Sequence, residues 1–158
     1  MRHENKSFKY GDLPEEVHND IFVNCSFSGK LPHFIGCEFH SCDLHRTEVH
    51  TLIACNLWSC NLNGANFSSA DVRFSITNAG SPCTAYGAEW QGVACLLDCG
   101  FFGGIKADEK DAEIFLIMGV IPQTKLRKKL LAFFSENLKK EMKKRLAKGF
   151  RNQRDMDK

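Results

Sequence analysis

The chain has 158 residues, of which 43% are hydrophobic and 25% charged, with a formal net charge of +2. This composition excludes a disordered or fibrous chain, and the longest apolar run, 114–120, is far shorter than the roughly 18 residues of a membrane span. The first residues lack the apolar stretch of a signal peptide, so we expect a cytoplasmic protein whose eight cysteines do not form a disulfide framework.

Charge and composition divide the chain into four segments. Residues 1–18 are expected to form an N-terminal cap or arm. Residues 19–106 contain all eight cysteines, carry a net charge of −3 and form a repetitive body. Residues 107–122 are predicted as a capping helix and a turn, and residues 123–158 as a basic amphipathic helix with a frayed end. Residues 125–158 alone carry a net charge of +9, so the near-neutral total hides an acidic body and a basic tail.

From residue 37 the body repeats in fives. Each five has a small residue, a polar one, a large apolar one and two mostly polar ones, as in Cys37–Ser41 and Cys60–Gly64. A period of five matches neither a helix at 3.6 nor a strand at 2.0. It requires a chain that turns a corner every five residues with the first and third side chains inward. Four such sides close a square coil, and stacked coils pair their backbones about 4.8 Å apart.

The sequence therefore predicts an all-β solenoid with an α-helical appendage. An earlier, less regular coil precedes the fives and contributes Phe22 and Phe34. The predicted structural core of the repeat consists of Cys25, Phe27, Cys37, Phe39, Cys42, Leu44, Val49, Cys55, Leu57, Cys60, Leu62, Ala65, Phe67, Ala70, Val72, Cys83 and Trp90.

A longer interval overlies the fives. Cys37, Cys60 and Cys83 recur at one constant interval. We interpret this interval as the length of one coil, with sides of five, five, eight and five residues, which predicts about four coils in all. Two further predictions follow: the three cysteines stack on one another, and the three-residue insertions form a ridge along one edge. These insertions are placed at about 50–54, 73–77 and 96–100.

The fives resemble the pentapeptide-repeat family, whose motif is Ala-(Asp/Asn)-Leu-x-x, over about residues 20–105. The resemblance implies a right-handed quadrilateral β-helix. Cysteine replaces the alanine of the motif at positions 25, 37, 42, 55 and 60. Some members of this family, the Qnr-type quinolone-resistance proteins and their relatives, resemble acidic duplex DNA, bind type II topoisomerases and dimerise through a C-terminal helix. For this chain the resemblance implies topoisomerase protection only as an alternative, because a body at −3 and a tail at +9 do not suit DNA mimicry.

Two helices are predicted after the body. Asp108 and Asp111 resemble an N-terminal capping pair for a short helix that closes the last coil. A second helix is predicted over 124–148. Its apolar stripe is Leu126, Leu130, Phe133, Phe134 and Leu138, and its candidate electrostatic contacts are Lys128, Lys129, Lys139, Lys140, Lys143, Lys144 and Arg145. Three interpretations stay open: packing on the solenoid or on a second copy as a homodimer, contact with nucleic acid, or contact with an acidic membrane surface.

The cysteines and histidines do not form a recognisable chemical site. Cysteine spacings of five, as at 37–42 and 55–60, differ from the two to four of structural zinc sites. His40, His45 and His50 each follow an inward residue and should face solvent on three different sides. The sequence also lacks a nucleophile elbow, paired carboxylates and a phosphate-binding loop. We therefore predict no catalytic residue, no metal ligand, no cofactor and no enzyme activity.

The remaining function class is binding. We predict a non-catalytic scaffold that presents a rigid surface to a protein partner, whose identity the sequence does not reveal. Large side chains at outward positions are the candidate contacts, because exposed aromatic and arginine side chains often anchor interfaces. These candidate partner-binding residues are Trp58, Arg73 and Tyr86.

Overall fold

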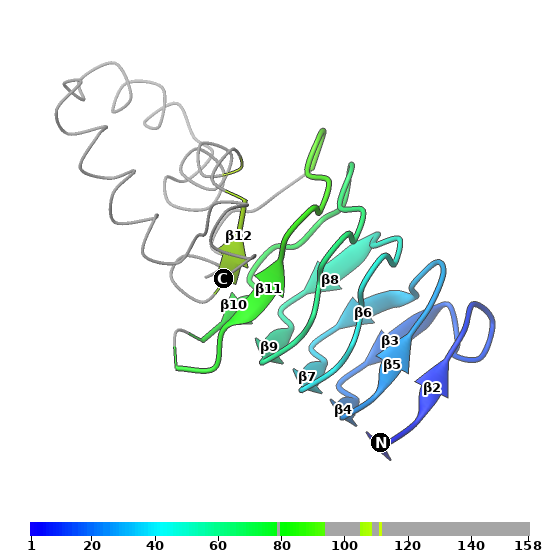
Figure 1. Ribbon diagram of the computed structural model, residues 1–158. Helices are drawn as coiled ribbons and strands as arrows, with labels where there is room; N and C mark the ends of the chain where they lie inside the picture. Colours follow the sequence, from blue (N-terminus) through cyan, green and yellow to red (C-terminus); the bar gives the residue numbers. More distant parts are fainter. Residues whose placement is uncertain (79, 94–104, 109–110, 112–158) are drawn as a thin grey trace, which may run out of the picture.

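The computed structural model describes residues 1–78, 80–93, 105–108 and 111 of the chain. These residues form a solenoid of about five turns, in which the strands of successive coils are parallel and stacked side by side (Figure 1). They contain no α-helix, so no helix in this part of the chain is long and apolar enough to cross a membrane.

The coil has four faces, which the chain visits in the order 1, 2, 3, 4. Face 1 is the five-stranded sheet of β1 (Arg2–Glu4), β4 (Ile21–Val23), β7 (Glu38–His40), β9 (Asn56–Trp58) and β10 (Ile76–Thr77). Face 2 pairs β2 (Ser7–Phe8) with β5 (Ser26–Phe27) and continues through bridges at Asp43 and Asn61 to β11 (Cys83–Ala85) and β12 (Ile105–Ala107). Face 3 has only single bridges, which join Lys30, Glu48, Asn66 and Glu89. Face 4, opposite face 2, is β3 (Glu16–His18), β6 (His33–Ile35) and β8 (Thr51–Ile53), extended by a bridge to Asp71.

A left-handed residue ends each five-residue side and turns the corner. At the corner from face 4 to face 1 these residues are Asn19, Gly36, Ala54 and Phe74, with φ between 54° and 68°. The N–H of the corner residue donates to a carbonyl of the next coil, as Gly36 does to Ile53 at 2.8 Å. Since the corners pair with one another, the same turn repeats from coil to coil.

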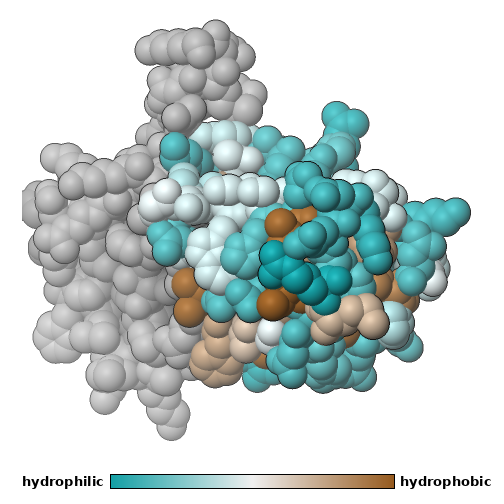
Figure 2. Space-filling view, turned by 90° about the horizontal axis from the view of Figure 1, so that it is seen from below, coloured by the Kyte–Doolittle hydropathy of each residue, from teal (hydrophilic) through white to brown (hydrophobic). Residues whose placement is uncertain are grey.

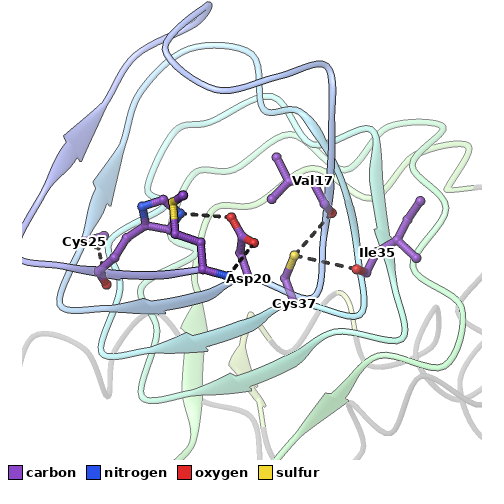
Figure 3. Close-up of polar contacts among 7 residues, drawn as sticks. Val17, Asp20, Cys25, Ile35 and Cys37 are labelled. Carbon is purple, nitrogen blue, oxygen red and sulfur yellow. Dashed lines mark hydrogen bonds and ion pairs between the residues drawn. The ribbon is translucent and has the colours of Figure 1, made fainter.

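The small residue that follows each corner points inward, where the backbones of two coils crowd it. The Cys37 thiol lies 3.3 Å from the Val17 carbonyl oxygen, in the coil before, and 3.7 Å from that of Ile35 (Figure 3). The Cys60 thiol has the same arrangement, 3.3 Å from the Phe39 oxygen. A cysteine at this position therefore both fills the inner edge and donates to a carbonyl group.

The third residue of each five fills the axis. Phe22 and Phe39 stack with ring centroids 5.2 Å apart, and Phe67 and Trp90 with centroids 4.2 Å apart. Every residue that we assigned to the structural core of the repeat is buried, none more than 4% exposed. Packing of stacked rings and aliphatic side chains between parallel coils is the main source of hydrophobic stabilisation in such a solenoid.

The solenoid begins earlier than the sequence indicated. β1 pairs with β4, β2 with β5 and β3 with β6. Residues 2–18 are thus the first coil, so the stack of coils begins at residue 2 and not at residue 19. The fives do not reveal this coil because a loop at 9–15 replaces its third face. His3 takes an inward position there, 5% exposed and stacked on Phe22. The first coil also brings the number of turns to about five, in place of the four predicted.

The prediction of a constant coil length is also wrong. Glu38 pairs with Asn56, whereas Asn61 pairs with Thr84. The turn from Glu38 to Asn56 therefore has fewer residues than the turn from Asn61 to Thr84, and the difference equals the length of one side. The turn from Glu38 to Asn56 is short because its third side, from Glu48 to Thr51, advances by only three residues. The eight residues 47–54 are therefore two sides of a coil and not one side with an insertion. The interval from Cys37 to Cys60 is one such shorter turn plus one further side.

Two dependent predictions change with this register. Cys37 stacks against Cys55, while Cys42, Cys60 and Cys83 form a separate column, so Cys37 and Cys60 lie on different sides of the coil. The predicted ridge does not form, because 50–54 includes the regular strand β8. A true insertion lies between Ile76 and Thr84, where Asn78 and Ser81 form an antiparallel bridge. The predicted insertion at 96–100 lies outside the described residues.

The C-terminal predictions fall almost wholly outside the described residues, which include only 107, 108 and 111 from residue 107 onward. The helix that Asp108 and Asp111 are predicted to begin lies outside the described residues. The Asp108 carboxylate accepts a hydrogen bond at 2.7 Å from the N–H of Gly87, a left-handed corner residue of the preceding coil. In lower coils a backbone carbonyl takes this role, as Tyr86 does for Gly64. Asp108 thus satisfies a corner N–H at the end of the described solenoid.

Candidate protein-binding surface

Apolar side chains are exposed at the corner between faces 4 and 1. We call Ile53, Trp58, Arg73, Phe74 and Ile76 the corner patch. Phe74 is 52% exposed and Ile76 is 51% exposed, while Ile53 and Trp58 are half-buried. In the view of Figure 2, apolar residues interrupt the hydrophilic surface in several places. The corner patch therefore combines two exposed apolar side chains with an outward tryptophan and an arginine.

Phe74 stands at the left-handed corner position, with φ of 60°. The same column in the lower coils holds Asn19, Gly36 and Ala54. Glycine and asparagine tolerate this conformation, whereas a bulky side chain in it is an outlier that costs about 1–2 kcal/mol. Since half of the ring is exposed, internal packing offsets only part of this cost. Phe74 is thus a locally strained residue with its side chain at the surface.

Ile76 results from an inversion of the repeat. In the five that starts at Ser75, isoleucine occupies the second, outward position and threonine the third, inward one. Ser75 keeps the inner edge satisfied, because its hydroxyl donates to the Leu52 carbonyl and accepts from the Cys55 N–H at 3.1 Å. Ile76 pairs with Asn56 in the sheet of face 1. The inversion therefore moves apolar bulk outward without breaking the ladder of hydrogen bonds.

Trp58 lies on face 1, one coil before Ile76. Its ring stacks on His40 of the coil below, with centroids 4.3 Å apart and planes 6° from parallel. His40 is in turn 3.3 Å from the Glu38 carboxylate. The stack fixes the tryptophan ring in one orientation, which reduces the side-chain entropy that binding a partner would cost.

Arg73 lies beside Phe74 and is held by Asp71. Its Nη2 is 3.0 Å from Asp71 Oδ2, and its Nε donates to Oδ1 at 3.2 Å. Arg73 is exposed, so this pair contributes little to stability but holds the guanidinium in place. Trp58 and Arg73, predicted from sequence, thus share the corner patch.

The third predicted contact residue is in the wrong environment. Tyr86 is only 9% exposed, so almost none of its surface is open to a partner. It follows β11, which β12 covers, and its N–H donates to the Asn63 side chain at 2.8 Å.

The signals for Phe74 and Ile76 were present in the sequence but were not used. Phe74 is a large aromatic residue at the fifth place of its five, where 41, 59 and 69 have serine and 64 has glycine. Ile76 precedes Thr77, which reverses the order of polar and apolar residues. These two breaks in the repeat indicate features of the surface, whereas our sequence analysis uses breaks only to predict coil length.

Four histidines pair with an acidic side chain two residues earlier in the sequence. These pairs are Glu16–His18, Glu38–His40, Asp43–His45 and Glu48–His50, with separations from 2.7 to 3.4 Å. His40, His45 and His50 lie on three different faces of the coil. Within the described part of the chain, no group of three or more histidine, cysteine or acidic residues is arranged to hold a metal ion.

The six cysteines that the structure describes are buried free thiols. Burial raises the pKa of Cys25. Hydrogen bonding to Cys37, together with burial, raises the pKa of Cys55, and bonding to Cys42 and Cys83 does the same for Cys60. Hydrogen bonds with Cys55 and Cys60 lower the pKa of Cys37, Cys42 and Cys83. A nucleophilic cysteine requires access to substrate as well as a lowered pKa, and these three thiols are buried. These thiols therefore serve the inner edge of the coil.

Comparison with known proteins identifies the repeat. Residues 51–75 match the family model of pentapeptide repeats, with eight copies. The chain carries pentapeptide repeats. The matched residues include 56–75, which form, among the described coils, the turn whose four sides all have five residues, since Asn56 pairs with Ile76. A search of curated proteins found no match.

Two solved structures of QnrB1, a plasmid-mediated fluoroquinolone resistance protein, are similar to this pentapeptide-repeat chain; both are trypsin-treated variants. The first has 24% identity and a TM-score of 0.29, and the match covers 68% of this chain and 50% of that one. The second has 16% identity and a TM-score of 0.27, with coverage of 78% and 98%. The match to the first structure spans about half of the length of that QnrB1 chain.

Proposed function

We propose that this pentapeptide-repeat protein is a non-catalytic scaffold that binds another protein through the corner patch. The observation that carries the proposal is Phe74, a bulky residue that is in a left-handed conformation and is 52% exposed. The corner requires the left-handed conformation but not a bulky side chain in it, and strained residues are concentrated at functional sites. A partner that buries this ring would supply the contact that the isolated chain lacks.

The surroundings of Phe74 suit a protein interface. Ile76 adds apolar area on the next side, Trp58 is pre-ordered by its stack on His40, and Arg73 is fixed by Asp71. Aromatic, apolar and arginine side chains grouped on a rigid support are typical of interface hot spots. The parallel ladders of faces 1 and 4 hold these residues with little freedom, so the scaffold presents them without first having to fold.

The test is quantitative affinity capture with the full chain. The wild-type protein and a Phe74→Asn/Ile76→Asn double variant are immobilised and exposed to lysate of the native host. A Ser68→Ala/Gln91→Ala variant on face 3, opposite face 1, serves as the matched control. We expect a protein that the wild type and control retain equally and that the double variant retains at least tenfold less. If every captured protein is retained equally by all three, the proposal is wrong.

The identity of the partner is a separate proposal. A type II topoisomerase is the alternative partner implied by the resemblance to Qnr-type proteins, and a supercoiling assay with a quinolone tests it. Protection or inhibition that Phe74→Asn/Ile76→Asn abolishes supports it, and no effect of the wild type removes it. A cytoplasmic location, a homodimer through 123–158 and nucleic-acid or membrane contact by the basic segment also stand as proposals.

A further inference from the structure

A cavity of about 290 Å³ lies at the N-terminal end of the solenoid, away from the corner patch. It forms where the loop between β2 and β3 replaces the third face of the first coil (Figure 1). The loop is anchored at both ends, since the Phe8 carbonyl accepts from Ser28 at 3.0 Å and the Glu15 carbonyl from His33 at 2.8 Å. A turn closed by Lys9 and Asp12 braces its middle. The cavity is therefore a defined feature of the first two coils.

The floor of the cavity is apolar. Phe8 and Leu13 are partly buried and pack against the core, where Phe27 and Leu31 are fully buried. Pro14 and Pro32 complete the apolar lining. Its volume is near the lower end of the about 300–1,000 Å³ of small-molecule sites. A ligand for this site is accordingly small, with a compact apolar body.

The rim carries a positive charge excess. Lys9 and Lys30 line the cavity together with one acidic residue, Glu15. Within the described part of the chain neither lysine has an ion pair. The Lys30 ammonium lies 6.0 Å from the centroid of the Tyr10 ring, which is itself on the lining. Two ammonium groups that outnumber the one carboxylate of the rim, above an apolar floor, complement a ligand with one anionic group and one apolar part.

We propose that this cavity binds a small amphipathic anion, a carboxylate whose apolar chain lies on Phe8, Leu13 and Leu31 and whose charged group meets Lys9 and Lys30. This site shares no residue with the corner patch and does not depend on the function proposed for that surface. Its ligand class follows from charge complementarity with the rim and from the size and apolar floor of the cavity.

The test is an NMR titration of the full-length, ¹⁵N-labelled protein with octanoate, with 1-octanol as the uncharged control. We expect saturable shifts at the amides of 9–13 and of 28–31, and at least tenfold weaker binding of octanol. Lys9→Ala/Lys30→Ala should weaken octanoate binding about tenfold through loss of charge-assisted contacts. Lys6→Ala, an exposed lysine outside the lining, should leave it unchanged. Glu15→Gln should strengthen it by removing the one like charge.

Three results overturn the proposal. The first is the absence of saturable shifts at these amides, and the second is equal binding of octanol and octanoate. The third is equal octanoate affinity of the wild type and Lys9→Ala/Lys30→Ala. Both lysines are exposed, so the variant should keep the spectrum of the folded protein. Should it not, Glu15→Gln alone decides, since an unchanged or weaker affinity contradicts the charge argument.

Discussion

Replacing Phe74 with asparagine separates the strain of the corner from the chemistry of the surface. Asparagine at Asn19 already adopts the left-handed conformation in the same column. The substitution relieves part of the about 1–2 kcal/mol that a bulky left-handed residue costs. It also removes the buried part of a residue that is 52% exposed, and half of a phenylalanine's burial is about 1 kcal/mol. The two effects have opposite signs and similar size.

We therefore expect Phe74→Asn to change the free energy of unfolding by less than about 1 kcal/mol while it reduces partner capture at least tenfold. Urea unfolding followed by circular dichroism measures the first quantity. Phe67→Ala is the contrast, since that ring is fully buried and its loss should cost about 3–5 kcal/mol. If Phe74→Asn costs more than about 2 kcal/mol, the ring is a structural element, and the argument from strain to binding is wrong.

Three further predictions concern the coil itself. The six buried cysteines should resist iodoacetamide at pH 8 in the native protein and react after unfolding, which peptide mass mapping measures. Rapid labelling of Cys25, Cys55 or Cys60 in the native protein would contradict the raised pKa of these thiols. Gly36→Ala and Gly87→Ala should each lose about 1 kcal/mol of stability because both glycines are left-handed. Gly36→Ala should lose more, since its Cβ would collide with the Asn19 side chain, whereas the Cβ of Gly87→Ala would meet nothing. An Asn19→Gly background should remove the difference, and equal losses in the wild-type background would refute the corner geometry. Burial alone would raise the pKa of Asp20, but hydrogen bonds from His3 and the terminal ammonium outweigh it and lower the pKa. The carboxylate therefore stabilises the fold above the unfolded pKa of about 4, and the gain disappears as pH falls through the lower folded pKa. Asp20→Asn should accordingly be less stable than the wild type at pH 6 but not at pH 2, and a stability difference that is the same at both pH values would contradict this linkage.

The sequence predicted the solenoid and its interior because the fives encode both. A small residue fits only the inner edge and a large apolar one only the axis, so Cys55 and Leu57 could be placed from their order alone. Coil length was harder, because a side of three residues next to one of five looks the same in sequence as one side of eight. Only the pairing of Glu48 with Asn66 and of Thr51 with Asp71 distinguishes them.

The first coil and the surface could be predicted only in part. His3, Phe8 and Val17 lack the small residue that stands two places before the axial residue of a regular five, and their inward positions follow from pairing with β4, β5 and β6. Trp58 and Arg73 could be assigned outward because both follow an axial residue directly. Tyr86 also follows an axial residue, Ala85, yet it is only 9% exposed, which the five-residue pattern does not indicate.

Site-specific photocrosslinking tests the binding account most directly. p-Benzoylphenylalanine placed at Ile76 lies in the corner patch, and the same group at Ser68 lies on face 3, opposite face 1. With the captured partner present, the account predicts a crosslinked product from position 76 that competing wild-type chain abolishes, and no such product from position 68. Crosslinking from position 68 but not from position 76 would contradict it.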